Sequence, residues 1–326
     1  MENNEMKMFV YGLREYDERE FFEVYSKQYG IDFASCPEKP TLENIHLAEG
    51  CDAINILTAP VDRAMIDKYH EMGIRCIATR TIGYDHIDYV YARKKGIGVV
   101  NISYSPATVA DYTVMMILMG IRKIKYIRLR AEVQDYTLEG KLACELGNLT
   151  VGIIGTGRIG SCLAHELTGF GCRMLAYDPF PKDELKELVE YTDMDTLLRQ
   201  SDIITLHAPA IEENYHIIDA DAFAKMRPGS GIVNCARGAL VDSDAMIDAI
   251  ESGHLGFACL DTVEHEFGLY YYNRMGEPLN NPRLAVLNSH PNVITTPHMA
   301  FYTREAVSDM VENSIIGIQK YLREQD

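Results

Sequence analysis

The sequence predicts an α/β fold with two Rossmann-like domains, each built on a doubly wound parallel sheet. Three observations predict this fold. Short apolar runs alternate with amphipathic stretches of helical period, which is typical of parallel strands covered by helices. The alternation restarts after a long helical stretch near residues 106–132. A chain of 326 residues, 47% of them hydrophobic, is also long enough to form two separate cores.

The first domain is predicted from three apolar, strand-like runs and from the helical stretches between them. The strands are expected at KMFVYG, DAINILT and RCIATR, and the helices at DEREFFEVYSKQYG and DRAMIDKYHEMG. The long helical stretch that follows begins near Pro106, because proline is favoured in the first turn of a helix, and it ends near Glu132.

The second domain is predicted from six further strand-like runs, with helices between most of them. These runs are LTVGIIG, CRMLAYD, DIITLHAP, GIVNCA, GFACLD and NVITTP. The last helix, TREAVSDMVENSIIGIQKYLREQ, carries an apolar stripe that we expect to pack against the first domain. The predicted domains are therefore residues 1–101 with 300–326, and residues 102–299.

Composition and charge exclude several classes of protein. A formal net charge of −17 would repel a phosphate backbone, so nucleic acid is not expected as a partner. The start MENNEMKM lacks the pattern of a signal peptide, and the longest apolar run, YTVMMILMGI, is about half a membrane span. Eight cysteines without CxxC spacing indicate buried thiols rather than zinc ligands or disulfides. The sequence predicts a cytoplasmic protein that needs no metal and does not contact a membrane.

A glycine-rich turn gives the clearest single motif. Gly155, Gly157 and Gly160 form GxGxxG after an apolar run and before a helical stretch, and Asp178 ends the next strand. The predicted cofactor-binding loop comprises Gly155, Thr156, Gly157, Arg158, Ile159 and Gly160. An aspartate at this place accepts hydrogen bonds from ribose hydroxyls and repels a 2′-phosphate, which favours NAD over NADP. The alternative is a structural glycine turn with a surface aspartate.

Charged residues follow three neighbouring strand-like runs of the second domain. Arg237 lies in NCARGALVD, Asp261, Glu264 and Glu266 lie in LDTVEHEFG, and His298 lies in TPHMAFYT. Each alone has an ordinary explanation, as a solvated side chain or a structural histidine. Parallel strands end at one edge of a sheet, however, so we expect these groups to gather beside the nucleotide site.

The motifs together resemble the D-isomer-specific 2-hydroxyacid dehydrogenases, and within them the D-lactate dehydrogenase branch. The resemblance covers nearly the whole chain, through TRTIGYDHID, NISYSPATVADYT, TVGIIGTGRIG, DIITLHAP, NCARGALVD, LDTVEHEFG and TPHMAFYT in this order. It implies an active-site cleft between the two domains, a substrate domain that is discontinuous and an NAD-binding second domain. It also implies that Arg237 is the catalytic arginine, that His298 is the proton donor and acceptor, and that Glu266 is its acidic partner.

Further residues take roles from the same resemblance. The expected substrate-binding residues are Arg14, Tyr104, the backbone amides of Ile82 and Gly83, and, as an aromatic wall, Phe301. The expected additional cofactor contacts are His207 and Pro209, which would line the cofactor cleft, and Asp261, which would lie beside the nicotinamide. The implied reaction is the reduction of pyruvate to D-lactate by hydride transfer from NADH.

Three alternatives remain open at the level of sequence. A larger 2-oxo acid, such as phenylpyruvate or 2-oxoisocaproate, is the second candidate for the substrate. A non-enzymatic corepressor that senses NAD(H) shares the same motifs, although the Ser/Pro-rich tails of such proteins have no counterpart here. The stretch ADYTVMMILMGIRKIKYI is expected to pair two nucleotide domains in a homodimer, and its alternative role is that of an internal core helix.

Overall fold

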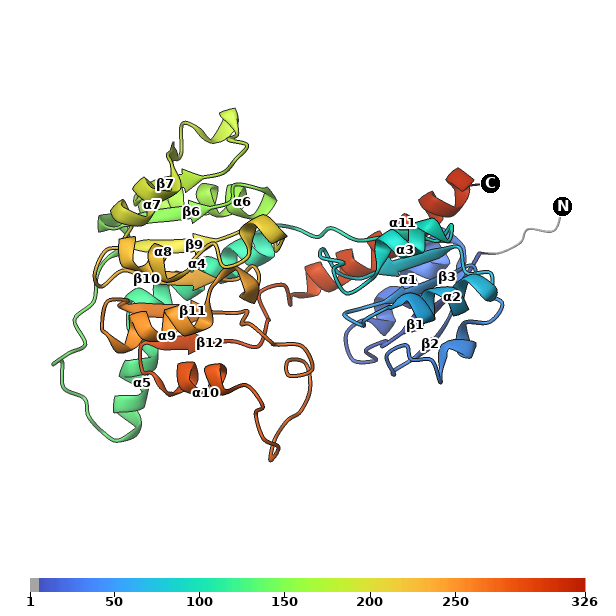
Figure 1. The fold of residues 1–326 in the computed structure, drawn as a ribbon, viewed down its shortest axis with the longest axis horizontal. Coiled ribbons are helices and arrows are strands. Elements are labelled where there is room, and N and C mark those ends of the chain that lie inside the picture. The colour runs from blue at the N-terminus through green and yellow to red at the C-terminus, as the bar shows by residue number, and fades with distance from the viewer. Residues whose placement is uncertain (1–5, 326) are drawn as a thin grey trace. The chain divides into compact units, whose positions relative to one another are not determined.

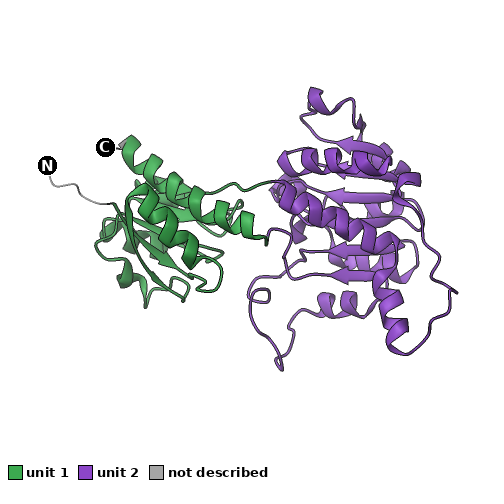
Figure 2. Ribbon diagram, turned by 180° about the vertical axis from the view of Figure 1, so that it is seen from behind, with its two compact units in different colours: residues 1–105, 302–326 green, residues 106–301 purple. Residues whose placement is uncertain are grey.

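The computed structural model describes residues 6–325, and it divides the chain into two compact units (Figure 2). Unit 1 comprises Met1–Ser105 with Tyr302–Asp326, and unit 2 comprises Pro106–Phe301. The domain limits expected from the sequence, at 101/102 and 299/300, lie a few residues before these. Most of the amino-terminal stretch that argued against a signal peptide lies outside the described residues.

Unit 1 contains a five-stranded parallel sheet in the order β2-β1-β3-β4-β5 (Figure 1). Its strands are β1 Met6–Tyr11, β2 Ile31–Cys36, β3 Ala53–Ile56, β4 Cys76–Thr79 and β5 Gly98–Val100. Its helices are α1 Arg19–Tyr29, α2 Arg63–Glu71, α3 Tyr89–Lys94 and α11 Arg304–Gln325.

Side chains of β1 alternate between the two faces of the sheet in unit 1. Phe9 and Tyr11 belong to a buried cluster with residues of α2 and α3. Met8 and Val10 point to the opposite face, into a cluster with residues of α1 and α11. This alternation with period two gives the sheet two cores, and the last helix of the chain closes one of them.

Two strands of unit 1 were not predicted, because both lie at an edge of the sheet. On β2 only Ile31 is buried, so its sequence lacks the apolar run of a central strand. On the other edge β5 has three residues and begins with Gly98. A Cβ at Gly98 would lie 2.2 Å from the ring of Tyr321 on α11, so the glycine allows that helix to pack closely.

Unit 2 contains a seven-stranded parallel sheet in the order β12-β11-β10-β9-β6-β7-β8. Its strands are β6 Thr150–Ile154, β7 Arg173–Tyr177, β8 Glu190–Tyr191, β9 Ile203–Leu206, β10 Gly231–Asn234, β11 Phe257–Leu260 and β12 Val293–Thr295. Its helices are α4 Ala107–Ile121, α5 Ile124–Glu132, α6 Arg158–Leu167, α7 Met194–Gln200, α8 Ala220–Lys225, α9 Ser243–Glu251 and α10 Pro282–Ser289. All six predicted strands of this unit are present, and the two-residue β8 was not predicted.

The strand order of unit 2 reverses between β6 and β9. From β6 the chain adds β7 and β8 on one side, and then it returns to add β9 to β12 on the other. Helices α7, α8, α9 and α10 contribute to one large buried cluster, whereas α4 and α6 contact each other and α4 contacts β10 and β11. In open parallel sheets the loops at such a reversal form a ligand crevice.

The single helix expected near residues 106–132 is two helices. Helix α4 ends at Ile121, and α5 begins at Ile124, after Lys123 adopts a left-handed conformation with φ 54°. The two helices also differ in burial, because α4 has eight buried residues and α5 has none. The sequence did not reveal this break, because proline and glycine are the residues that mark the end of a helix, and position 123 is a lysine.

None of the helices in the described part of the chain has both the length and the apolar character that a membrane crossing requires. All eight cysteines lie within the described residues, and each is a free thiol.

Candidate active site

The glycine loop lies at the point where the strand order of unit 2 reverses. Gly155 follows β6 with φ 93°, and a Cβ there would lie 2.8 Å from the backbone of His207, which follows β9. A Cβ at Gly160 would lie 2.0 Å from the carbonyl oxygen of Gly155. Neither position can hold a side chain unless the backbone moves, so both glycines are required by close packing.

The amino-terminal end of α6 is open to a ligand. Gly157 is the N-cap of this ten-residue helix, and apart from its chain neighbours no atom of residues 6–325 lies within 4 Å of the position that a Cβ there would occupy. The helix begins at Arg158, whose side chain is exposed. Free amides and the positive end of the helix dipole at such a place suit a pyrophosphate, so these residues fit a dinucleotide.

Asp178 is held against the glycine loop. Its Oδ2 accepts hydrogen bonds from Thr156 N at 2.6 Å and from Thr156 Oγ1 at 3.0 Å, and its Oδ1 accepts one from Phe180 N at 2.8 Å. The hydroxyl of Tyr191 donates to Thr156 Oγ1 at 2.9 Å. The carboxylate is thus oriented by three protein donors at the carboxyl end of β7.

His207 and Pro209 follow β9 on the other side of the reversal. Burial lowers the pKa of His207 to about 4, so its ring is neutral near pH 7. His207 Nε2 lies 2.9 Å from Thr205 Oγ1. The Pro209 carbonyl accepts hydrogen bonds from Ile211 N and from the Asn214 side chain, which shape this loop.

His298 and Glu266 form the pair that the sequence suggested. His298 Nδ1 lies 2.6 Å from Glu266 Oε1, and the other carboxylate oxygen accepts from Val263 N at 3.1 Å. The carboxylate can only accept, so Nδ1 carries the hydrogen and Nε2 remains for a ligand. His298 adopts φ 55°, an uncommon conformation for a residue with a side chain.

Asp261 holds the backbone around His298. This fully buried aspartate accepts hydrogen bonds from Thr296 Oγ1 at 2.5 Å, from Met299 N at 2.8 Å and from Ala300 N at 2.8 Å, and its carbonyl accepts from His298 N at 2.8 Å. Burial raises the pKa of Asp261, while these donors oppose the shift. Both carboxylate oxygens of Asp261 therefore accept hydrogen bonds from residues 296–300, the segment that carries His298.

Arg237 lies in a loop that is shaped by Asn234 at the end of β10. The Asn234 side chain donates to Arg237 O at 2.8 Å and accepts from Ala236 N at 3.0 Å. A Cβ at Gly238 would lie 2.1 Å from the backbone of Val263, so this loop packs directly on the segment after β11. Because β10, β11 and β12 are adjacent strands, Arg237, Asp261 and His298 follow the same edge of the sheet.

The two glutamates after β11 have different partners. Glu264 Oε1 lies 2.8 Å from His216 Nε2, and Oε2 accepts from Ser243 N at 3.0 Å. Burial acts to raise the pKa of Glu264, but these hydrogen bonds outweigh burial and hold it below its usual value. Glu264 therefore joins the loop after β9 to the start of α9, and Glu266 is the glutamate that contacts His298.

Arg14, in unit 1, belongs to a network of alternating charges. Arg14 Nε donates to both carboxylate oxygens of Asp17, at 2.9 and 3.0 Å, and Asp17 also accepts from the Tyr302 hydroxyl at 2.5 Å. Glu18 accepts from Arg14 N and from the fully buried Arg80. Among the described residues, the buried Arg14 Nη2 makes no hydrogen bond, but it forms an ion pair with Glu18 Oε1 at 3.3 Å.

The loop with Ile82 and Gly83 is fixed by its carbonyl groups. Thr81 Oγ1 donates to Gly83 O at 2.6 Å, and Asn101 Nδ2 donates to Ile82 O at 2.7 Å. Within residues 6–325, neither the Ile82 nor the Gly83 amide donates a hydrogen bond. Tyr104, a half-buried residue of unit 1, completes the set expected in this unit.

Sequence reasoning missed Tyr271, whose ring lies beside His298 in unit 2. The ring centroids of Tyr271 and His298 are 6.0 Å apart, and that of Phe301 lies 6.2 Å from Tyr271 and 6.3 Å from His298. The aromatic run LYYYN was visible in the sequence, but only the folded chain brings one of its three tyrosines to the histidine.

Comparison with known proteins agrees with this arrangement of unit 2. The family model of the D-isomer specific 2-hydroxyacid dehydrogenase, NAD binding domain, matches residues 114–300. The chain belongs to the D-isomer specific 2-hydroxyacid dehydrogenases. It is an NAD-dependent oxidoreductase, and the prediction of this family, of its parallel-sheet fold and of the cofactor NAD is confirmed.

Relatives of the dehydrogenase match it over nearly its whole length. An aromatic 2-oxoacid reductase of Clostridium sporogenes (strain ATCC 7955) is 42% identical over 97% of this chain and 96% of its own. A D-lactate dehydrogenase of Lactiplantibacillus plantarum is 35% identical over 97% of this chain and 96% of its own. The solved structure of a D-2-hydroxyisocaproate dehydrogenase has a TM-score of 0.90 at 34% identity and covers 98% of both chains. These relatives act on side chains of different size.

Proposed function

We propose that the dehydrogenase reduces a 2-oxo acid to the D-2-hydroxy acid, with His298 as the proton donor. The observation that carries this proposal is the hydrogen bond of 2.6 Å between His298 Nδ1 and Glu266 Oε1. NADH supplies the hydride for C2 of such a substrate. The substrate oxygen then needs a proton, and His298 can donate it from Nε2 while Nδ1 remains bonded to Glu266.

The side chains around the pair suit the remaining demands of the reaction. Arg237 offers a planar cation that stays charged, as the carbonyl and carboxylate oxygens of a 2-oxo acid require. Asp261 keeps the backbone of His298 in place through Met299 and Ala300. We assign Asp261 to this positioning role in addition to the expected place beside the nicotinamide.

Unit 1 contains the groups that we propose to bind the substrate carboxylate. The Ile82 and Gly83 amides have no acceptor within residues 6–325, and the buried Arg14 Nη2 makes no hydrogen bond there beyond its ion pair with Glu18. Tyr104 is proposed as a further contact. Asp17 and Glu18 already balance the charge of Arg14 and Arg80, so Arg14 acts mainly as a fixed donor.

Two substrates are proposed, which differ in side-chain size. Pyruvate, giving D-lactate, is the substrate that the sequence motifs favoured, and the 35% identical D-lactate dehydrogenase supports it. A larger 2-oxo acid such as phenylpyruvate is favoured by the 42% identical aromatic 2-oxoacid reductase. The test is the loss of NADH absorbance with pyruvate, 2-oxobutyrate, 2-oxoisocaproate and phenylpyruvate, followed by chiral chromatography of the products. No oxidation of NADH with any of them, or an L product, would contradict the proposal.

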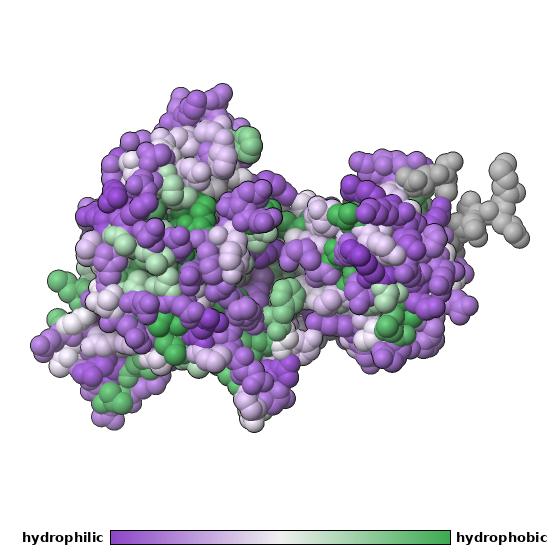
Figure 3. Space-filling view, viewed as in Figure 1, coloured by the Kyte–Doolittle hydropathy of each residue, from purple (hydrophilic) through white to green (hydrophobic). Residues whose placement is uncertain are grey.

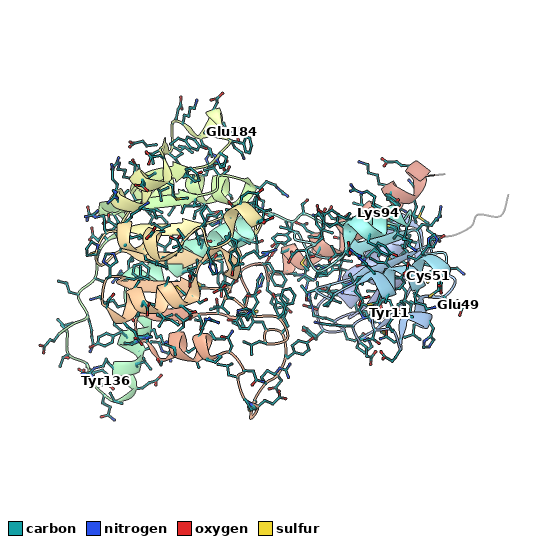
Figure 4. All side chains as sticks on the ribbon, in the orientation of Figure 1. Tyr11, Glu49, Cys51, Lys94, Tyr136 and Glu184 are labelled. Atoms are coloured by element: carbon teal, nitrogen blue, oxygen red, sulfur yellow. The ribbon has the colours of Figure 1, made fainter. Side chains whose placement is uncertain are left out.

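We also propose a homodimer that pairs through α5 and the segment after it. Apolar residues, green in Figure 3, reach the surface in the part of the view where Figure 1 labels α5. Tyr136 projects from this segment in Figure 4, and Val133, Leu138 and Leu142 are also exposed, the last of them to 88%. The neighbouring groove of about 610 Å³ is lined in part by Ile124 and Leu142.

The surface formed by α5 and the segment after it exposes more apolar side chains than a solvated helix requires. A second copy of the chain would cover it. The stretch expected to pair two copies includes α4, whose buried residues pack inside unit 2. We therefore propose pairing through the part of this stretch beyond Arg122 and through the segment after it. Light scattering at micromolar concentration should give a dimer, and a monomer would contradict the proposal. A cytoplasmic location is proposed as well, because all eight cysteines are free thiols, as is usual in a reducing compartment.

A further inference from the structure

A fully buried arginine follows β4 in unit 1. Arg80 is the first residue after this strand, and its side chain has no exposed surface. Burying a guanidinium costs free energy, and replacing a whole buried ion pair with apolar side chains is often neutral or stabilising. Stability alone therefore does not explain why a charged residue occupies this position.

The three nitrogens of the Arg80 guanidinium donate hydrogen bonds to four residues. Nε donates to Glu18 Oε1 at 2.9 Å, and Nη1 donates to Asn55 Oδ1 at 3.0 Å. Nη2 is shared among Glu18 Oε2 at 3.3 Å, Gly12 O at 3.3 Å and Tyr11 O at 3.4 Å. A lysine presents one nitrogen on a flexible stem, so only the planar fork of arginine reaches all of these acceptors.

Two of these contacts fix the segment that carries Arg14. The carbonyl of Gly12, which accepts from Arg80, lies two residues before Arg14. Glu18 accepts from Arg14 N at 3.0 Å, and its Oε1 lies 3.3 Å from Arg14 Nη2. Glu18 N also donates to Arg14 O at 3.0 Å. The backbone and the guanidinium of Arg14 are therefore both held by the glutamate that Arg80 anchors.

The opposite end of the network is attached to the last helix of the chain. Asn55, on β3, donates from Nδ2 to Ser314 Oγ on α11 at 2.8 Å. Ser314 Oγ in turn donates to Val311 O at 2.7 Å. Asn55 and Ser314 are both fully buried. Arg80 therefore cannot shift unless contacts with a central strand and with α11 are broken, so it is a rigid support.

The charges of the network are balanced. Arg14 and Arg80 are two cations, and Asp17 and Glu18 are the two carboxylates that contact them. A substrate carboxylate would therefore gain little from the total charge of this cluster. Its binding would depend instead on where the fork of Arg14 places its donors, because the bonds between a guanidinium and a carboxylate are directional.

We propose that Arg80 is a positioning residue, which holds Arg14 in the geometry that binds the substrate carboxylate. This inference rests on the proposed function, in which Arg14 contacts that carboxylate. Arg80 does not touch the substrate, because its side chain is fully buried. It acts through Glu18 and through the carbonyl of Gly12.

Loss of this support should weaken the binding of the 2-oxo acid. A hydrogen bond to a charged group changes an affinity by about 10- to 150-fold, so Arg80→Met and Arg80→Lys should raise the KM for the 2-oxo acid within this range. The KM for NADH should stay unchanged, because the cofactor loop belongs to unit 2. The kcat should change less than the KM, because His298 and Glu266 also belong to unit 2.

The experiment measures kcat and both KM values by NADH absorbance, with the 2-oxo acid that the wild type reduces best. Ile66→Ala is the matched control for a loss of stability in unit 1. Ile66 is fully buried in α2 and is not part of the hydrogen-bonded network, and a cavity in a core lowers stability to a similar extent as a broken ion pair. This variant should keep the KM of the wild type for the 2-oxo acid.

Two double variants separate positioning from stability. Arg80→Met combined with Glu18→Leu removes both buried charges and should recover stability, whereas the KM should stay raised because Arg14 has lost its support. In the Arg14→Gln background, the residue that Arg80 positions is absent, so Arg80→Lys should raise the KM by less than it does in the wild type. Thermal unfolding tests each variant for a folded structure, and Arg80→Lys carries the test if Arg80→Met does not fold.

The expected result is a raised KM for the 2-oxo acid in the Arg80 variants, also where stability has been recovered. An unchanged KM in the folded Arg80 variants would overturn the proposal, and so would an equal rise in Ile66→Ala. A KM that returns to the wild-type value together with stability, or an effect of full size in the Arg14→Gln background, would overturn it as well. In each of these cases the wild type still oxidises NADH, so the proposed function stands. Failure of the wild type to oxidise NADH with any 2-oxo acid would instead reject the proposed function.

Discussion

Replacing Glu266 with glutamine removes the negative charge beside His298 and preserves the size of the side chain. In the wild type the two side chains are 18% and 23% exposed, and Nδ1 and Oε1 are 2.6 Å apart. A hydrogen bond that involves charged partners contributes about 1.5–3 kcal/mol, and each 1.36 kcal/mol changes a rate about tenfold. Losing this hydrogen bond should therefore lower kcat of the variant by about 10- to 150-fold.

The loss should appear in both directions of the reaction, because the same imidazole donates the proton in reduction and accepts it in oxidation. The kcat for reduction is measured by the loss of NADH absorbance and the kcat for oxidation by its gain. Pre-steady-state kinetics establish that hydride transfer is limiting.

Glu264 provides the control for this experiment. It lies two positions before Glu266 but contacts His216 rather than His298, so Glu264→Gln should leave kcat unchanged in both directions. His298→Ala should lower kcat by about 100- to 10,000-fold, the usual size of positioned acid catalysis, and it should still bind NADH. If kcat falls in neither direction in Glu266→Gln while hydride transfer is limiting, the pairing has no catalytic role.

Three further predictions concern the cofactor loop and the core. The wild type should prefer NADH over NADPH by about 30- to 1,000-fold in kcat/KM, since a like-charge contact and lost ribose hydrogen bonds cost about 2–4 kcal/mol. Asp178→Ala should reduce this preference. An unchanged preference would show that Asp178 does not contact the ribose. Gly160→Ala places a Cβ 2.0 Å from Gly155 O and must displace the cofactor loop, so the affinity for NADH, measured by its fluorescence, should fall. An unaltered affinity for NADH would contradict this close packing. Arg80→Met leaves the fully buried Glu18 with Arg14 as its remaining cationic partner, so it should lower the free energy of unfolding by about 3 kcal/mol, the low end of the cost of breaking a buried ion pair. The denaturation midpoint tests this value, and an unchanged midpoint would refute it.

Much of the fold follows from the sequence because central strands and helices have local patterns. All six predicted strands of unit 2 are present, since buried parallel strands are continuous apolar runs bounded by turn residues. The edge strands β2, β5 and β8 lack that signal and were missed, whereas the edge strand β12 has two buried residues and was predicted. The break at Lys123 was missed as well, because a left-handed residue between two helices has no marker when glycine is absent.

The site shows the same division. GxGxxG with its acidic residue can be read from the sequence, because the close approach of Gly155 to His207 and of Gly160 to Gly155 admits only glycine. The candidate catalytic residues could also be named, because each follows a strand of one parallel sheet. The resemblance already assigned Glu266 to His298, but only the folded chain shows that Glu264 contacts His216 instead.

By itself, the sequence determined the fold class, the family and the types of side chain available for hydride and proton transfer. These depend on periodicity, on glycine at crowded positions and on the order of motifs along the chain, all of which are local. Only the tertiary structure decided that Asp261 holds the His298 segment through three donors and that Tyr271 stands beside the imidazole. These contacts join residues 27 to 39 positions apart, and their geometry depends on how strands and loops pack together, which no local pattern encodes.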